Sequence, residues 1–497
     1  MTVSAPLPPG RLEPGDGDLS TQLAPPSPVL DVGEAMSWLY EPVEHQLRSR
    51  KASHTREGRP TRGLLALLAL LPLLVLLSIR LIRLVNDTLF TAYGAGVLSA
   101  TILVMYLSFG WYHDKSRGVT LPPDPPLVTC MLAVKDDVDL IGRCVSSVLD
   151  STYPNLELIV VDDASTDGST ELLRRLASRR AFTLICLERN VGKKRALTKA
   201  ASQAHGEIFV FTDSDCIVSP HAITQCVKAL VADLRIGAVS GHARALNAEA
   251  TLLTRIQDSW YDGQFGVAKA AESVFGTVTC VSGPMAAFRR SAIYDYLPAW
   301  AEDSFLGREF KFATDRQLTA YVLGQEQIGL KLKARHAGST LITQEGHPPR
   351  RWRVEYVASA RVLTNVPESV RGMFKQQARW KKSFIRNLFF TGAFLWRRGP
   401  VPSFLFYGHV LWVCAAPLLA FRHLVWLPLH GGGRYTLVYF AGVLLKGSVW
   451  ALAYRIQNPG SPKWVYRPLM SLLSSVFLSW VLLYSALTLR KSVWSRG

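Results

Sequence analysis

The seven cysteines of this 497-residue sequence are scattered, and no two of them form a Cys-x-x-Cys pair. This spacing disfavours both a zinc site and a framework of disulfide bonds. It is typical of a domain that stays reduced in the cytosol. A signal peptide is also missing, because residues 1–34 are rich in Pro, Gly and Asp and contain no apolar core. We therefore expect residues 1–62 to be a disordered, basic tail in the cytoplasm.

Acidic residues are comparatively few, since 38 Asp and Glu stand against 56 Lys and Arg, for a formal net charge of +18. Such an excess is found in nucleic-acid-binding proteins, and also in proteins that face a membrane or an anionic substrate. The sequence contains no RNA-binding module and no zinc-finger pattern. We therefore predict a lipid bilayer and an anionic substrate as partners, and no nucleic acid.

Two long apolar runs, Leu64–Leu84 and Leu89–Trp111, are separated by only four residues. Each run is long enough to cross a bilayer as a helix, so residues 63–112 are predicted to form a transmembrane hairpin. The alternative is a buried helical hairpin in a soluble protein. A block of basic residues precedes the first run, and the positive-inside rule places that side in the cytoplasm. Two crossings would then return the chain to the cytoplasm near His113.

Residues 120–385 alternate short apolar strands with helical patterns. Strands are expected at 127–134, 156–163, 182–188 and 207–215, with helices near 138–150, 168–180 and 193–204. This order predicts an α/β domain with a mostly parallel sheet, whose ligands lie at the carboxyl ends of the strands.

Polar residues stand where these strands end. Asp162 and Asp163 end one strand, where they suit a ribose or a base edge, although capping the next helix explains them equally well. Asp213 and Asp215 follow a later strand, and two carboxylates at this spacing can reach one Mg²⁺ or Mn²⁺ ion at a diphosphate. The alternative is a solvated turn. Lys193 and Lys194 open a helix, where cations suit phosphate, or else form a solvated helix face.

Two further segments do not indicate a function when each is considered alone. Asp315 lies in Ala313-Thr314-Asp315-Arg316, where a carboxylate would serve as a general base or as half of a surface ion pair. The segment Gln376–Trp380 combines an amide, a cation and a large aromatic ring, which suit pyrophosphate and a sugar ring, but it is also compatible with a plain amphipathic helix.

Taken together and in this order, the segments Val161-Asp162-Asp163, Asp213-Ser214-Asp215, Ser282-Gly283-Pro284, Thr314-Asp315-Arg316 and Gln376–Trp380 resemble processive family 2 glycosyltransferases. The likeness is greatest to hyaluronan synthases and to chitin and chitooligosaccharide synthases. It covers about residues 127–390 and continues weakly to Trp494-Ser495-Arg496, which is similar to a C-terminal gating motif, Trp-Gly-Thr-Arg. It implies a GT-A-like catalytic domain that is inserted between transmembrane segments and polymerises UDP-sugars with Mg²⁺ or Mn²⁺.

The resemblance also implies a role for each matching residue. The uridine would be contacted by Asp163 and Asp162, with Lys193 and Lys194 near the nucleotide. Asp213 and Asp215 would serve the metal and diphosphate, with Asp215 as the direct ligand. The acceptor pocket would be lined by Cys280, Ser282, Gly283 and Pro284. Asp315 would be the catalytic base, and Gln376, Arg379 and Trp380 would lie at the pyrophosphate and the acceptor sugar.

The sequence departs from the hyaluronan synthase pattern where Ala313-Thr314 replaces Gly-Asp before the expected base. Because of this departure, the motifs do not identify the transferred sugar. A chitin-like or poly-N-acetylglucosamine synthase and a non-processive lipid-linked sugar transferase therefore stay as alternatives. A transporter with a degenerate domain is a third alternative, which the carboxylates Asp213, Asp215 and Asp315 argue against.

Three apolar segments return within residues 400–497, at about 402–428, 435–454 and 468–489. The first two are expected to cross the membrane and to leave the basic loop around Lys463 in the cytoplasm. The third is expected to lie in the membrane interface, because a crossing would carry the cations of the C-terminal tail to the disfavoured side. The expected protein is a multi-pass cell-membrane protein whose catalytic domain is cytoplasmic.

Overall fold

Repeated strand–helix units between Val128 and Phe211 form one half of a twisted sheet in the computed structural model, which describes residues 33–41 and 87–490. Four strands alternate with three helices here, as the sequence predicts: β1 Val128–Val134, α5 Val138–Leu149, β2 Leu156–Asp162, α6 Ser169–Ala177, β3 Thr183–Cys186, α7 Lys193–Ala201 and β4 Ile208–Phe211. The predictions for the N-terminal tail, the run Leu64–Leu84 and the segment Trp494–Arg496 fall outside the described residues.

The eight strands follow the order β3-β2-β1-β4-β7-β6-β10-β5. Strands β3, β2, β1 and β4 are parallel, whereas the other half is mixed. It contains β5 Cys216–Val218, β6 Ile236–Ala245, β7 Ala286–Arg289 and β10 Arg353–Thr364. Successive strands run outward from β1 to β3, and β4 then joins the other side of β1. The strand ends around β1 are therefore the topological switch point, where α/β sheets bind ligands.

Helices cover the sheet because its strands are apolar on both faces. Every residue of β6 is buried, as are all but one of β1 and β10. Such continuous burial is expected for central strands that have helices on both faces. The remaining elements of this region are α8 Ala222–Ala232, α9 Leu252–Gly263, η1 Gln264–Lys269, α10 Ala270–Ser273, α11 Arg290–Ile293, η2 Tyr294–Tyr296, α12 Leu297–Ala301, β8 Ser304–Phe305, β9 Arg308–Glu309, α13 Thr314–Arg335 and α14 Val370–Gly392. The expected GT-A-like α/β fold is confirmed.

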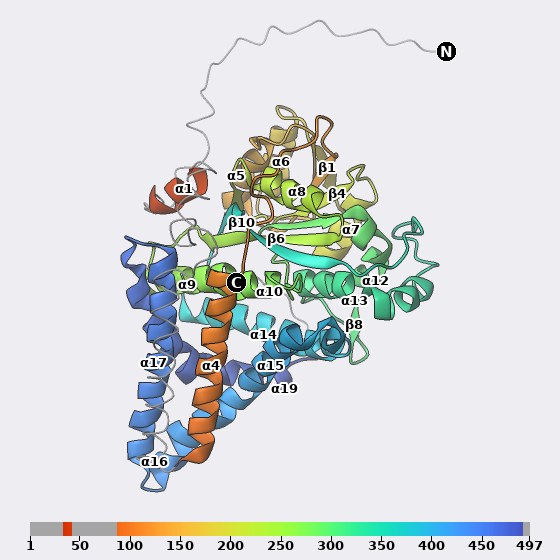
Figure 1. Cartoon of the computed structure of the whole chain (residues 1–497). Helices are drawn as coiled ribbons and strands as arrows, with labels where there is room; N and C mark the ends of the chain where they lie inside the picture. Colours follow the sequence, from red (N-terminus) through yellow and green to blue (C-terminus); the bar gives the residue numbers. More distant parts are fainter. Residues whose placement is uncertain (1–32, 42–86, 491–497) are drawn as a thin grey trace, which may run out of the picture.

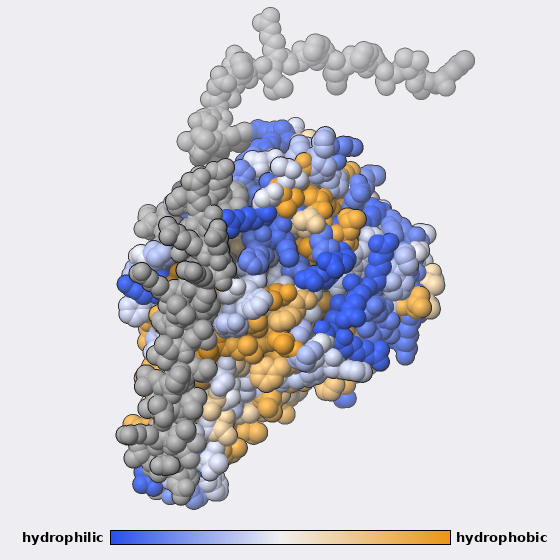
Figure 2. Space-filling view, viewed as in Figure 1, coloured by the Kyte–Doolittle hydropathy of each residue, from blue (hydrophilic) through white to orange (hydrophobic). Residues whose placement is uncertain are grey.

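Four helical segments in the described residues are long and apolar enough to cross a membrane: Thr88–Gly110, Pro400–Leu429, Gly433–Gln457 and Pro462–Leu487. The first is α4, and the next two follow η3 Leu395–Arg398 as α15 Pro400–Phe421, η4 Arg422–Trp426, α16 Leu427–Leu429 and α17 Gly433–Gln457. Figure 1 shows α4 and α17 side by side below the sheet. In Figure 2, hydrophobic residues gather on the lower part of the visible face, in the region of α15, and hydrophilic residues cover most of the α/β part.

The far ends of α4 and α15 are joined by a buried polar cluster. Asp87, which caps α4, accepts hydrogen bonds from the Phe90 amide and from the Arg422 guanidinium. The His423 ring lies 3.2 Å from the same carboxylate and stacks on Tyr439 of α17. A buried carboxylate needs such partners to remain in an apolar surrounding. This cluster holds the three helices together at the end opposite the catalytic domain.

The fourth segment starts and ends against the α/β domain. It consists of η5 Pro462–Val465, α18 Tyr466–Leu473, η6 Ser474–Leu478 and α19 Ser479–Leu487. At its start the Lys463 ammonium lies 2.7 Å from Glu249, and at its end Leu489 packs on the apolar cluster of Phe310 and Phe312. Ser485 of α19 donates a hydrogen bond to the Ala378 carbonyl of α14. The segment is also long and apolar enough to cross a membrane, so its interfacial placement stays a prediction.

Candidate active site

The two carboxylates at the end of β2 are buried and held by the surrounding loops. Asp162 accepts hydrogen bonds from the Ser165 amide, at 3.0 Å, and from the Thr170 hydroxyl. Asp163 accepts one from the Val191 amide at 2.7 Å and one from the Gly192 amide at 2.9 Å. Burial raises the pKa of Asp163, while these two amides oppose the rise. Asp163 thereby fixes the loop that leads into α7, where Gly192 has a φ of +86°.

The Asp213-Ser214-Asp215 turn offers two carboxylates to one point. Donor atoms of Asp213, Asp215 and Cys216 all lie within 4.8 Å of one another. The Cys216 thiol is fully buried, and burial followed by the two carboxylates raises its pKa far above the ordinary value. Hard oxygen ligands fit Mg²⁺ or Mn²⁺ and a soft thiol does not, so the two carboxylates are the candidate ligands.

A glycine brings the expected acceptor loop against this turn. A Cβ atom on Gly283 would lie 2.9 Å from Asp213 Oδ2, which is too close for a side chain at this position. The Thr212 hydroxyl donates a hydrogen bond of 2.7 Å to the Pro284 carbonyl. The Ser282-Gly283-Pro284 segment is thus fixed next to the candidate metal ligands.

Two consecutive lysines at the start of α7 face different partners. Lys193 forms an ion pair with Asp213. Lys194 is buried, and its ammonium donates to Asp303 at 3.1 Å, to the Phe310 carbonyl at 2.9 Å and to Gln317 at 2.8 Å. Burial lowers the pKa of Lys194 to about 8, although Asp303 opposes the shift.

Asp303 receives a second cation from the opposite side, because Arg386 of α14 donates to its other oxygen at 2.9 Å. The three charges form a buried Lys194–Asp303–Arg386 bridge that ties α7 to α14. Lys194 also reaches the first turns of α13 through Gln317. The sequence analysis names Lys194 but misses Asp303 and Arg386. Arg386 could have been found from its spacing. It follows Arg379 by seven residues, which places both side chains on one side of a helix.

Lys269 is a third residue near the site that could not be selected from the sequence. It is buried in η1, where its ammonium donates to Ser240 at 2.9 Å, to the Cys280 carbonyl at 2.7 Å and to Ser282 at 2.5 Å. Burial lowers its pKa. Its contacts fix both ends of the segment Cys280–Ser282, so Lys269 shapes the acceptor loop from below.

Asp315 lies in the first turn of α13 and faces the same loop. The Cys280 thiol lies 3.4 Å from Asp315 Oδ2, and the other oxygen accepts from the Arg316 amide at 2.8 Å. Burial, followed by the nearby Asp315 carboxylate, raises the pKa of Cys280 to about 11, so the thiol is a proton donor to Asp315 at neutral pH. The helix starts with Ala313 at a φ of +61°, a conformation that is uncommon for a non-glycine residue.

The segment Gln376–Trp380 lies on α14. Burial raises the pKa of the Tyr261 phenol, Asp215 and Asp213 add to the rise and Arg379 opposes it, so the arginine and the two carboxylates lie near the same buried group. Trp380 stacks on Trp260 with 5.8 Å between ring centroids. Gln376 Oε1 is buried and has no hydrogen-bond partner among the described residues, so it is an acceptor that remains available.

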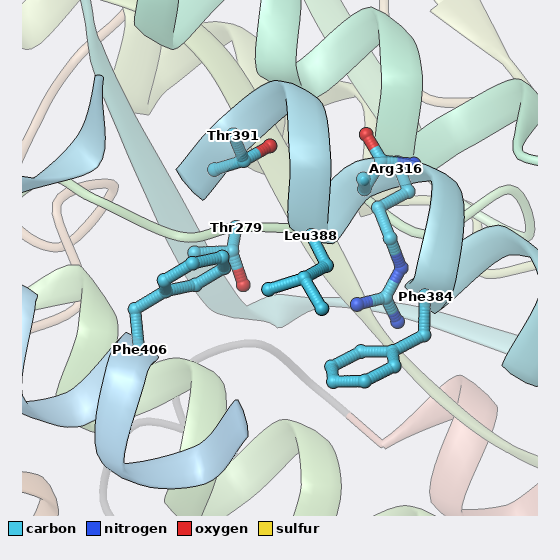
Figure 3. A pocket seen from close by; sticks show the side chains of 7 residues that line it. Thr279, Arg316, Phe384, Leu388, Thr391 and Phe406 are labelled. Atoms are coloured by element: carbon cyan, nitrogen blue, oxygen red, sulfur yellow. The ribbon is translucent and has the colours of Figure 1, made fainter. Parts of the chain in front are cut away.

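Asp315 lines one pocket, and its neighbour Arg316 lines another. One contains Asp315 together with Lys193, Gly283, Trp300 and Thr314 in its lining. The other lies on the side of the apolar helices and is shown in Figure 3. Its lining consists of Thr279, Arg316, Phe384, Asn387, Leu388, Thr391 and Phe406. The residues next to Asp315 and Cys280, namely Arg316 and Thr279, face this second pocket, so the candidate base stands between the two.

The fold and the arrangement of carboxylates define a class. Residues 130–297 match the model of glycosyl transferase family 2, and the chain carries a glycosyltransferase domain of that family. As a whole it resembles hyaluronan synthases, as the motifs predicted. A hyaluronan synthase of Streptococcus pyogenes is 27% identical over 408 residues, which cover 80% of this chain and 89% of that protein.

Two further relatives extend the comparison. Hyaluronan synthase 3 of Xenopus laevis is 25% identical over 450 residues, 82% of this chain and 74% of that protein. An N-acetylglucosaminyltransferase of Azorhizobium caulinodans is 27% identical over 411 residues, 82% of this chain and 96% of that protein. A solved mannosyltransferase from Pyrobaculum calidifontis aligns with a TM-score of 0.47 at 20% identity, over 82% of this chain and 98% of that one.

The buried bridge predicts a stability effect that a surface lysine of the same helix does not share. Lys194→Met leaves Asp303 with one cation in place of two. We expect the free energy of unfolding to fall by about 3 kcal/mol because a buried ion pair is broken. Lys199→Met, at an exposed position of α7, should change stability by less than about 0.5 kcal/mol. Thermal unfolding of the two purified variants measures this difference. Equal melting temperatures would show that the bridge does not support the domain.

Proposed function

We propose that this chain is a membrane-embedded, inverting glycosyltransferase that polymerises UDP-sugars into an exported polysaccharide. The observation that carries the proposal is the pocket in which Asp315 faces Lys193 and Gly283, because it gathers a base, a phosphate partner and the metal turn around one space. The resemblance to hyaluronan synthases over four-fifths of the chain supports it.

The proposal assigns a role to each residue that matches the motifs of the family. Asp162 and Asp163 shape the uridine site at the end of β2, and Lys193 and Lys194 lie at the nucleotide. Cys280, Ser282, Gly283 and Pro284 line the acceptor side. Gln376, Arg379 and Trp380 serve the pyrophosphate and the terminal sugar of the acceptor. Asp213 and Asp215 are the residues that would hold Mg²⁺ or Mn²⁺, with Asp215 as the direct ligand.

The proposed reaction is one displacement at the anomeric carbon. Asp315 accepts the proton of an acceptor hydroxyl, whose oxygen bonds to the anomeric carbon on the face opposite the diphosphate. The bond between that carbon and the diphosphate oxygen breaks, and UDP leaves with the electron pair. Arg379 stabilises the charge that develops on UDP. A divalent ion, when bound, supplies further positive charge to the leaving diphosphate.

The proposed setting is a cell membrane with the α/β domain on its cytoplasmic side. The segment from Pro462 to Leu487 would lie along the interface, since both of its ends contact the domain. The crossings would then be α4, α15 to α16 and α17, together with the first apolar run. The growing chain would leave between these helices, next to the pocket of Figure 3.

Three cationic side chains near this exit favour an acidic polymer over a chitin-like one. Arg316, Lys381 and Lys446 come from α13, α14 and α17, and no carboxylate of the described residues forms an ion pair with any of them. Burial lowers the pKa of Lys381 to about 8, and Arg316 and Lys446 contribute to the shift. Lys446 stands in the middle of α17, where a charge is costly unless it serves a ligand.

In Figure 3 the Arg316 side chain extends from the start of α13 toward Phe384 and Leu388 of α14. The Phe384 ring lies 6.0 Å from the His409 ring and 5.9 Å from the Lys381 ammonium. Cations that are not neutralised by protein repel one another, so an anionic ligand stabilises such a group. Carboxylates repeated along a polysaccharide would provide these anions, whereas an uncharged poly-N-acetylglucosamine chain would not.

The donor requirement tests the proposed function. Membranes that contain the protein are incubated with single radiolabelled UDP-sugars and with pairs, and Asp215→Ala membranes are the control. We expect polymer only when UDP-N-acetylglucosamine and a UDP-uronate are supplied together. Polymer from UDP-N-acetylglucosamine alone would support the chitin-like alternative, and single-sugar transfer to lipid would contradict a polymerising enzyme.

The basic exit predicts a separate effect on product length. Lys446→Gln removes a cation from the middle of α17, so we expect shorter acidic polymer with little change in the initial rate of donor use. Arg434→Gln removes the same charge from the exposed start of the helix and should leave the length unchanged. Gel electrophoresis of labelled product compares the two variants. Identical length distributions would show that Lys446 does not contact the chain.

A further inference from the structure

A short helix that precedes the membrane segments is docked on the catalytic domain. The helix α1, Gly33–Tyr40, holds Leu39 fully buried in an apolar cluster with Ile217, Leu246 and Leu363. Met36, Trp38 and Leu140 pack around this cluster. Its neighbour Tyr40 is 52% exposed, so the helix presents one face to the domain and the other to solvent.

The buried anchor of α1 touches the two elements that flank the metal turn. Ile217 belongs to β5, which begins one residue after Asp215 and forms the edge of the sheet. Leu140 belongs to α5, and the residue before that helix, Asp137, accepts a 2.5 Å hydrogen bond from Ser214 in the turn. β5 has only three residues and pairs with β10, and its Val218 amide donates a hydrogen bond to Ser147 of α5, so α1 packs on the elements that support the turn from this side.

A second set of contacts locks α1 to β6 and β10. Arg361 lies over the Trp38 ring at 4.6 Å and pairs with Glu41 at 2.7 Å. Arg244 lies 5.3 Å from the same ring and forms a buried ion pair of 2.7 Å with Asp258 of α9. Asp258 in turn lies 3.4 Å from Lys463, at the start of the last apolar segment. The helix α1 thereby joins the sheet edge to a buried ionic chain that reaches this segment.

We propose that α1 is a positioning element for the metal turn, which holds β5 and with it Asp213 and Asp215 in the geometry that binds a divalent ion. This inference rests on the proposed role of the two carboxylates. The helix touches neither donor nor acceptor pocket, so its loss acts on the turn before it acts on the base. Undocking of α1 would uncover the edge strand and loosen the ligands.

The central test compares two aspartate substitutions at neighbouring positions. Leu39→Asp puts an unpaired carboxylate into the apolar cluster and should undock the helix, whereas Tyr40→Asp makes the same charge change on the exposed face. Binding of Mn²⁺ to the purified full chain is measured from the electron paramagnetic resonance of free Mn²⁺. We expect Leu39→Asp to weaken Mn²⁺ binding by about tenfold, equivalent to about 1.4 kcal/mol, and Tyr40→Asp to leave it unchanged.

Hydrogen–deuterium exchange locates the effect. Leu39→Asp, and more mildly Leu39→Ala, should speed exchange in residues 211–218 and leave β1 and β2 as protected as in the wild type. Faster exchange throughout the sheet would show general unfolding and overturn the inference. Wild-type Mn²⁺ affinity in both Leu39 variants would also overturn it.

The Asp215→Ala variant separates this inference from the proposed function. If Asp215→Ala loses Mn²⁺ binding while Leu39→Asp keeps it, only the role of α1 is wrong. If Asp215→Ala binds Mn²⁺ as tightly as the wild type, the metal role of the turn itself is wrong.

Discussion

The mutual repulsion of carboxylates around one pocket is the constraint on which the site depends. Asp315 lines the pocket, Asp213 lies against Lys193 and Gly283 of the same lining, and Asp215 lies beside Asp213. Carboxylates that are held around one space repel one another and push the loops apart unless cations intervene. Lys193 pairs with Asp213, and the Lys194–Asp303–Arg386 bridge ties the helices behind. Lys193 and Lys194, which pair with Asp213 and Asp303, are also the side chains that the proposed function puts near the nucleotide.

The buried bridge also explains how the catalytic and apolar parts act as one body. It links α7 at the nucleotide side to α14, which supplies Arg379 and Trp380 and supports α19 through Ser485. Lys269 supports the acceptor loop from η1, which packs on α4 and α17 through Val267. The elements that form the proposed donor site, acceptor loop and exit are thus in direct contact. A movement of one apolar helix would therefore change the position of Asp315.

The strand–helix order and the strand-end carboxylates could be predicted because each depends on local sequence. Alternation of apolar strands with helices predicted β1 to β4, and the position of Asp213 and Asp215 after β4 followed from the same pattern. Asp303 and Lys269 could not be found in this way. Their importance comes from partners more than ten residues away, and nothing near them in the sequence distinguishes a buried ion pair from a surface charge. The docking of α1 was missed for the same reason, since its partners lie on strands about 180 to 320 residues further along.

The exit side followed from tertiary structure alone. Lys446 reads in the sequence as one lysine in an apolar run, and Lys381 as one of several in a basic helix. Only the packing of α13, α14, α15 and α17 brings them to the same space as Arg316. The proposal of an acidic product therefore rests on an arrangement that no single motif encodes.

The central claim is that Asp315 removes the proton from the acceptor and does not hold the nucleotide. Asp315→Asn keeps the shape of the side chain and its hydrogen bond from Arg316, but it removes the base. Measuring UDP affinity and turnover on the same purified variant separates the two roles. For Asp315→Asn we expect a UDP affinity within about twofold of the wild type. Turnover should fall by at least about 10²-fold, because general base catalysis contributes a factor of that size. A parallel loss of UDP affinity and turnover would contradict it.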